Sequence, residues 1–287
     1  MGVNPMWLLL SLLAALLWGI GRTFIKKGLD RVTPLWTNIL DAFFFLVIFI
    51  PFSLLRGATF SIDPLMFGIL IGISLLYILD FYGLEKGQLA LAGTIIAAYP
   101  AVTILTATLF LGERLTQFQL VMIFFILLGG AIIGYTPNKM HQKRSQKTRS
   151  WFLWAVLVTI SLGIGDFFAK VVISSVGADT YNLFFPLAFV IGIFMFWLVD
   201  KQGRKLPKGK NRSQLWFTGI GVAMEVLAFL AFNFALLFGQ ASLVSPVSSS
   251  YAGLNIILAV CFLHERVSRI QFVGIGLILT GIAFIGS

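Results

Sequence analysis

The residues of this chain that could do chemistry are charged side chains placed inside long apolar stretches. Glu225 stands near the middle of the stretch 214–237, which holds no Lys or Arg, and Phe229 and Asn233 follow it on the same helical face. A charge at bilayer depth costs at least ~2.5–3.5 kcal/mol and normally faces a cavity or a partner. A carboxyl group among aromatic rings could hold a protonated amine or exchange a proton. Packing as a protonated, hydrogen-bonded side chain is the alternative for Glu225.

Aromatic and polar residues from neighbouring stretches are expected at a depth comparable or close to that of Glu225. Tyr99 and Tyr251 occupy equivalent positions in two stretches that repeat one another. We therefore predict a substrate-binding set around Glu225 that consists of Trp18, Tyr99, Phe229, Asn233, Ser248, Ser249, Tyr251 and Asn255.

A second group of charges is expected near one mouth of the protein. Counting residues at the helical rise puts Arg22, Asp41 and Asp80 at similar depth, so Arg22 can pair with one or both acids. Asn38 and Tyr77 lie about one turn before Asp41 and Asp80 and add polar groups to the same faces. We predict a polar gate or coupling cluster here, and a buried pair that only fixes helix register is the alternative.

Asp166 and Lys170 are spaced i,i+4 with the acid first, the order that favours pairing on a helix. We expect the two side chains to neutralise each other toward the opposite side of the membrane, within the same gate or coupling set.

Composition assigns the chain to membrane proteins. Of its 287 residues 59% are hydrophobic and 11% charged, whereas soluble domains carry about 25% charged residues. Apolar runs long enough to span a bilayer predict ten transmembrane helices at 7–24, 34–55, 65–84, 89–111, 118–135, 151–174, 180–199, 214–237, 241–263 and 270–286. The predicted fold class is an all-α membrane protein.

The spans divide into two halves that repeat one another. The segments 87–119 and 239–271 match without a gap, for instance at Gly87/Gly239, Tyr99/Tyr251, Glu113/Glu265 and Arg114/Arg266. A basic linker, 138–150, separates a first five-helix unit, 1–137, from a second, 151–287. Because each unit has an odd number of spans, the two must cross the bilayer in opposite directions. Inverted repeats of this kind are typical of secondary transporters, whose substrate site lies near the midplane.

Charge also predicts sidedness and excludes some partners. Most Lys and Arg residues fall in connections on one side, which the positive-inside rule makes cytoplasmic, with both termini outside. The net charge of +10 therefore indicates topology rather than nucleic-acid binding. His141 and His264 lie outside the predicted spans, no phosphate-binding GxxxxGK[ST] motif is present, and we expect neither a metal nor another cofactor. The Gly68/Gly72 and Gly130/Gly134 pairs are expected to pack within the monomer, which leaves a monomer or a homodimer open.

The run AYPAV followed by FLGERLT, within residues 98–116, and the corresponding segment 248–268 resemble the EamA family of the drug/metabolite transporter superfamily. The resemblance covers essentially the whole chain. It implies a ten-helix transporter of small organic metabolites that works by alternating access, with export as the expected direction. Glu113 and Glu265, next to Arg114 and Arg266, are expected to cap or pair locally at span ends.

The acids outnumber the bases in the spans, so we predict transport of an amino acid or amine across the cytoplasmic membrane, with protons as candidate coupling ions through Glu225. A sugar or nucleoside transporter is the alternative, suggested by the hydroxyl and amide groups of the predicted site. From other classes stand a non-transporting membrane scaffold and an intramembrane aspartyl protease. The protease reading rests on the GxGD motif that ends at Asp166, with Asp80 as second aspartate, and needs both within hydrogen-bonding reach.

Overall fold

The computed structural model describes residues 5–29, 32–86, 96, 98–135, 150–205, 212–251, 253 and 269–285. Within these ranges the chain forms ten helices: α1 (Met6–Gly28), α2 (Pro34–Leu55), α3 (Pro64–Lys86), α5 (Tyr99–Phe110), α6 (Gln117–Tyr135), α7 (Ser150–Val176), α8 (Ala178–Val199), α9 (Arg212–Phe238), α10 (Ala241–Ser248) and α12 (Arg269–Phe284). Helices satisfy their own backbone hydrogen bonds, as the bilayer interior requires. The all-α membrane fold is therefore confirmed.

The helices follow the predicted spans closely. Six of them, α1, α2, α3, α7, α8 and α9, contain a segment long and apolar enough to cross a membrane. Three further segments are shorter apolar helices: Tyr99–Phe110, Gln117–Ile132 and Phe272–Phe284. The predicted spans 89–111 and 241–263 are described only in part, and the linker 138–150 lies mostly outside the described residues. The exact boundaries of the two units remain a prediction.

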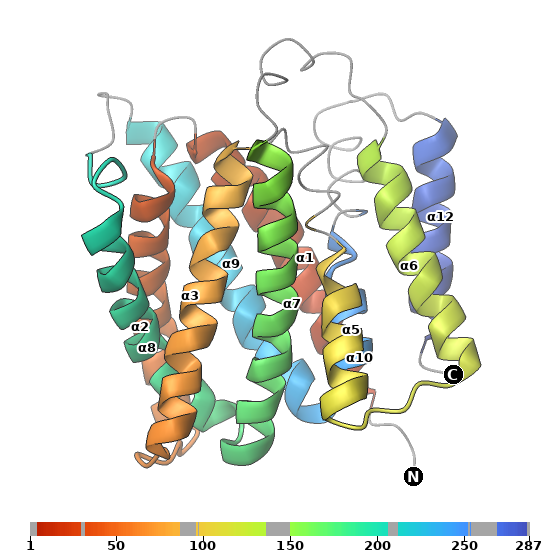
Figure 1. Cartoon of the computed structure of the whole chain (residues 1–287), viewed down its shortest axis with the longest axis horizontal. Coiled ribbons are helices and arrows are strands. Elements are labelled where there is room, and N and C mark those ends of the chain that lie inside the picture. The colour runs from red at the N-terminus through yellow and green to blue at the C-terminus, as the bar shows by residue number, and fades with distance from the viewer. Residues whose placement is uncertain are drawn as a thin grey trace.

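The helix contacts reveal the inverted repeat directly. α1 packs against α9 as α7 packs against α3, and α2 contacts α9 as α8 contacts α3. α2 with α8 and α6 with α12 each pack against their own counterpart, and α5 packs against α10, which belongs to the equivalent span of the other half. Exchanging the first five spans for the second therefore maps the α1–α9 and α2–α9 contacts onto the α7–α3 and α8–α3 contacts, and maps the α2–α8 and α6–α12 contacts onto themselves, as a pseudo-two-fold axis demands. Figure 1 shows α6 and α12 side by side at one edge of the bundle, and shows α1 starting and α12 ending on the same side.

Two glycines allow a close backbone crossing between α1 and α9, which belong to different halves. A Cβ on Gly21 of α1 would lie 2.8 Å from the carbonyl oxygen of Gly221 on α9, and a Cβ on Gly221 would lie 2.7 Å from that of Gly21. The α6–α12 contact is similar, because a Cβ on Gly129 would meet the Gly274 carbonyl oxygen and one on Gly281 that of Met122. Backbone contact through small residues is the usual way in which membrane helices approach closely.

The glycine pairs predicted to pack within the monomer do not include these residues. A Cβ on Gly68, Gly72 or Gly130 would have no atom within 4 Å in the described part of the chain. Gly68 and Gly72 thus pack against no described residue, whereas Gly130 lines a pocket inside the bundle together with Ile126, Ser249 and Ile278. The glycines that do contact a partner helix include Gly21, Gly163 and Gly165. Spacing along one helix does not identify them, because it does not show which face of the helix meets a partner.

The α2–α8 pair is tied together at both ends. Thr33 caps α2 by accepting from the Trp36 backbone N–H, and its hydroxyl donates to the Gly203 carbonyl oxygen in the turn after α8. At the other end Arg56, after α2, forms an exposed ion pair of 2.8 Å with Asp179 in the first turn of α8. These contacts hold α2 and α8 in register across the bilayer.

Candidate functional site

Arg22 is the centre of a buried ionic cluster that joins both repeats. Its Nη2 donates to Asp80 Oδ2 at 2.6 Å and lies 3.5 Å from Glu225 Oε1. Its Nη1 donates to the Tyr251 hydroxyl at 3.0 Å, and the guanidinium carbon lies 4.7 Å from the centre of that ring. The expected Arg22–Asp80 pair is present. The partnership with Glu225, which the sequence analysis left without a base, was not predicted.

The glycine crossing explains this partnership. Gly21 immediately precedes Arg22, and Gly221 lies one turn before Glu225, so backbone contact between α1 and α9 brings the two charges together. A Cβ on Gly21 would also lie 3.3 Å from the Glu225 backbone nitrogen. Larger residues at the crossing would widen the ion pair.

A small cavity lies beside the cluster and is lined by three acids. Asp41, Asp80 and Glu225 share its wall with aromatic rings that include Tyr77 and Phe229. It offers about 10 Å³ to the centre of a water-sized sphere, room for about one water molecule. In this conformation the cavity is therefore too small for a metabolite. Asp41 lines it but forms no ion pair with Arg22 in the described contacts, so only one of the two expected acids pairs with the guanidinium.

The cluster has more acceptor capacity than donors. Asp41 Oδ1, Asp80 Oδ1 and Glu225 Oε2 are buried and accept no hydrogen bond from the described residues. Asp80 and Glu225 thus share one guanidinium, and Asp41 faces the same cavity without an ion-pair partner among the described residues. An ionised carboxylate without partners is costly in a low-dielectric interior. The arrangement favours uptake of protons or of a cation with several N–H donors.

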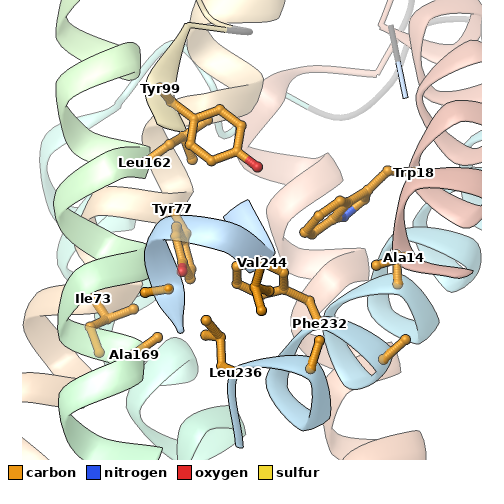
Figure 2. Packing of buried hydrophobic residues seen from close by; sticks show 14 of the residues in the cluster. Ala14, Trp18, Ile73, Tyr77, Tyr99, Leu162, Ala169, Phe232, Leu236 and Val244 are labelled. Carbon is orange, nitrogen blue, oxygen red and sulfur yellow. The ribbon is translucent and has the colours of Figure 1, made fainter. Parts of the chain in front are cut away.

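Aromatic rings enclose the side of the cluster formed by both repeats. Trp18 packs edge-to-face on Phe229 with ring centroids 5.2 Å apart and lies 6.4 Å from Tyr251. Tyr77 lies 5.2 Å from Phe229. Figure 2 shows Trp18 on one side of this region and Tyr77 and Tyr99 on the other, with the Tyr99 hydroxyl pointing inward. The structure therefore brings these five predicted site residues together.

Asp166 forms a second polar cluster, made of hydroxyl groups. Tyr77 donates to its Oδ1 at 3.0 Å and Ser245 to its Oδ2 at 2.6 Å, while Ser245 lies 3.4 Å from the Thr103 hydroxyl. A Cβ on Gly165 would lie 2.5 Å from the Tyr77 ring, so the absence of a side chain there lets the phenol reach the neighbouring carboxyl group. Ser245 and Thr103 were missed from sequence, because isolated hydroxyls in apolar spans are common.

The expected Asp166–Lys170 pair is wrong. Lys170 Nζ donates instead to the carbonyl oxygens of Leu236 and Gly239, at 2.6 and 2.8 Å, at the end of α9. A cation at a helix C-terminus is favoured by the unpaired carbonyls there. Spacing along α7 could not reveal that a neighbouring helix ends next to the ammonium group.

Some predicted site residues are used in packing. Asn233 donates to Asn182 at 2.7 Å, Asn38 donates to the Pro34 and Ile78 carbonyl oxygens, and the Ser249 hydroxyl donates to the Pro246 carbonyl oxygen. Ser248 is buried and its hydroxyl has no partner among the described residues. Asn255 lies outside the described residues.

Glu113 caps a helix of the other repeat. Its carboxylate accepts from the backbone N–H groups of Ala241 and Ser242, both at 2.9 Å, at the start of α10. The expected capping role is confirmed, but the prediction that it acts locally is wrong. A carboxylate at a helix N-terminus satisfies free N–H groups and complements the helix dipole.

The two aspartates of the protease hypothesis have separate partners. Asp80 pairs with Arg22, and Asp166 binds Tyr77 and Ser245. A catalytic dyad requires carboxyl groups that share a proton, and no hydrogen bond among the described residues joins these two carboxyl groups.

Comparisons with known proteins agree with this architecture. Over 133 residues, 44% of this chain and 89% of the relative, the sequence is 31% identical to the uncharacterized protein MJ1333.1 of Methanocaldococcus jannaschii. Over 134 residues, 47% of this chain and 94% of the relative, it is 25% identical to an uncharacterized transporter in the cobO 3' region of a Sinorhizobium species. About half of this chain thus covers nearly all of each relative, the length expected of a single repeat.

A crystal structure aligns with 98% of this chain and 96% of its own chain, with a TM-score of 0.78 and 17% sequence identity, which establishes a shared fold. The profile of the EamA-like transporter family matches residues 5–135 and again residues 149–287. Two matches, one to each repeat of a helical membrane bundle, show that this chain belongs to the EamA-like transporter family.

Proposed function

We propose that the protein exports a small metabolite carrying a protonated amine, such as an amino acid or a simple amine, across the cytoplasmic membrane of a bacterium or archaeon. The observation that carries this proposal is the excess of carboxyl groups at the centre of the bundle. Asp41, Asp80 and Glu225 line one cavity, and among the described residues Arg22 is the only base that pairs with these acids. A substrate ammonium group would supply the missing charge.

The chemistry of the cavity supports an ammonium ligand. An ammonium group has three N–H donors, and each acid presents one buried oxygen without a partner in the described residues. The neighbouring rings of Trp18 and Phe229 add faces to which a cation is attracted. Arg22, at the centre of the same cluster, could bind the carboxylate of an amino acid once Asp80 or Glu225 is engaged by the amine.

The mechanism proposed is alternating access. The cavity at present holds about one water molecule, so substrate entry requires the two repeats to move apart on one side. The tight α1–α9 and α3–α7 contacts would act as rigid pairs during this motion. Sidedness follows the basic connections, with both termini outside, and protons are the proposed coupling ion.

A ligand screen on the purified protein tests the substrate class. Amines (ethanolamine, putrescine, tyramine), amino acids (alanine, lysine), sugars and a nucleoside are compared for thermal stabilisation, and the stabilising compounds are then tested for transport in proteoliposomes. We expect amines or amino acids to stabilise the wild type and Glu225→Gln and Asp80→Asn to lose the effect. Asp63→Asn, the same chemical change at an exposed site before α3, is the matched control. Stabilisation by sugars or the nucleoside alone, unchanged in Glu225→Gln, contradicts the proposal.

A further inference from the structure

Asp166 is a buried acid that the proposed amine site does not use. α7 places its carboxyl group between α3 and α10, where Tyr77 and Ser245 donate to its two oxygens at 3.0 and 2.6 Å. Thr103 of α5, next to Ser245, donates to the Gly163 carbonyl oxygen one turn earlier on α7. The described partners of this carboxyl group are thus hydroxyl groups, which stabilise an anion without neutralising it.

Among the described residues, the titratable groups that face Asp166 from the surrounding helices are phenols. Tyr77 of α3 is in direct contact, and Tyr99 of α5 and Tyr181 of α8 lie within range of electrostatic interaction with the carboxyl group. Phenols are neutral in the pH range in which a carboxyl group exchanges its proton.

The neighbouring charges are already engaged elsewhere. Asp80 on α3 and Glu225 on α9 are oriented toward Arg22, and Lys170 on α7 itself binds the carbonyl oxygens at the end of α9. Of the described ionisable groups nearby, none supplies a counter-charge to Asp166. A proton is the simplest species that would neutralise this carboxylate.

Tyr77 connects this cluster to the amine site. Its hydroxyl donates to Asp166, and its ring lines the cavity shared by Asp41, Asp80 and Glu225. Protonation of Asp166 turns one of its two oxygens from an acceptor into a donor and weakens the hydrogen bond that it accepts from Tyr77, so the phenol is freer to turn toward the cavity. Asp166 also occupies, in the second repeat, the position that Arg22 occupies in the first. The two repeats therefore carry different groups at the same position. The first repeat has the guanidinium that pairs with Asp80 and Glu225, and the second has an acid whose described partners are hydroxyl groups.

We propose that Asp166 is the proton-carrying residue of the transport cycle, separate from the acids that hold the amine. This inference rests on the proposed proton-coupled transport. The Asp166 carboxylate takes up a proton from the outer side. It stays neutral while the protein changes from the outward-open to the inward-open conformation, and it then releases the proton to the cytoplasm. The amine leaves in the opposite direction, so a cation is exchanged for a proton.

Two assays on full-length protein in liposomes separate the roles. The first is counterflow of the amines of the panel at equal pH on both sides, which needs substrate binding and conformational change but no net proton movement. The second is amine accumulation driven by a pH gradient, with an entrapped pH-sensitive dye to follow protons. We expect Asp166→Asn to retain counterflow and to lose both gradient-driven accumulation and proton flux. Glu225→Gln should lose counterflow, and Asp63→Asn should match the wild type in both assays.

Tyr77→Phe and Ser245→Ala retain the carboxyl group and remove one donor each. They should keep coupling but move the pH midpoint of driven transport upward by roughly one unit, because the ionised form loses a stabilising hydrogen bond. Asp166→Asn that still accumulates amine under a gradient overturns the proposal. So does loss of counterflow in Asp166→Asn together with an unchanged midpoint in Tyr77→Phe, since Asp166 would then be a structural hub. If the wild type instead moves a sugar with protons and Asp166→Asn uncouples that flux, the amine proposal fails and the assignment of Asp166 stands.

Discussion

The crossing of α1 and α9 at Gly21 and Gly221 predicts a large effect of adding one methyl group. A Cβ at position 21 would lie 2.8 Å from the Gly221 carbonyl oxygen, whereas optimal non-bonded separations are about 3.5–4.0 Å. Both sides of the contact are backbone, so no side chain can rotate away and the helices must separate by roughly 0.7 Å. Overpacking of this kind costs about 1–3 kcal/mol. We expect Gly21→Ala to lower the free energy of unfolding and to widen the Arg22–Glu225 pair.

Gly68→Ala is the matched control, because a Cβ at position 68 would have no atom within 4 Å in the described structure. Both substitutions gain about 0.8–1.0 kcal/mol in helix propensity, so the difference between them isolates the cost of the clash. The assay is equilibrium unfolding in mixed detergent micelles titrated with SDS and followed by tryptophan fluorescence, to which the buried Trp7 and Trp18 contribute. Equal unfolding free energies for Gly21→Ala and Gly68→Ala would refute the reasoning.

Three further predictions use the same unfolding assay. Arg22→Gln leaves the neighbouring acids without a cation and should lower the free energy of unfolding by about 3–5 kcal/mol. Adding Asp80→Asn should recover part of that loss. Strict additivity of the two changes would contradict the ion-pair cluster. Glu113→Gln should lower the free energy of unfolding by about 0.5–2 kcal/mol through the weakened cap of α10. Arg56→Gln, in the exposed pair, should lower it by less than ~1 kcal/mol, and this effect should disappear at high salt. A larger loss for Arg56→Gln than for Glu113→Gln would count against the cap. Lys170→Met retains the apolar stem but leaves the carbonyl oxygens of Leu236 and Gly239 without this donor, and it should lower the free energy of unfolding by roughly 1–3 kcal/mol. An unchanged free energy of unfolding would mean that the ammonium group is dispensable for stability.

The elements of the fold were predictable because the bilayer imposes simple rules on sequence. A span requires a long apolar run, and α2 begins and ends at the predicted residues 34 and 55. The repeat could also be read from matched pairs such as Tyr99/Tyr251, and an odd number of spans per unit fixes their opposite directions. The Arg22–Asp80 pair followed from depth alone, since both residues lie near span ends on the same side.

The contacts between helices were less predictable because depth says nothing of the direction in which a side chain points around its helix. Arg22, Asp41 and Asp80 share a depth, but the rotation of α2 leaves Asp41 at the cavity wall rather than against the guanidinium. The glycine crossing that brings Glu225 to Arg22 is a property of two helices together. Lys170 was misassigned for the same reason, since its carbonyl partners belong to α9.

The pairing of each repeat with the other has a consequence for how the chain is made. The most extensive helix contacts, α1 with α9, α6 with α12 and α3 with α7, join residues from different halves. Domains emerge from the ribosome N-terminal first, at about 5–20 residues per second, so the first five helices enter the membrane many seconds before their packing partners exist. During that interval Arg22 already has Asp80 from its own half, while Glu225 and Tyr251 arrive only with the second. Asp80 is thus the partner of Arg22 that the first half itself supplies, and it can neutralise the guanidinium before the second half is inserted.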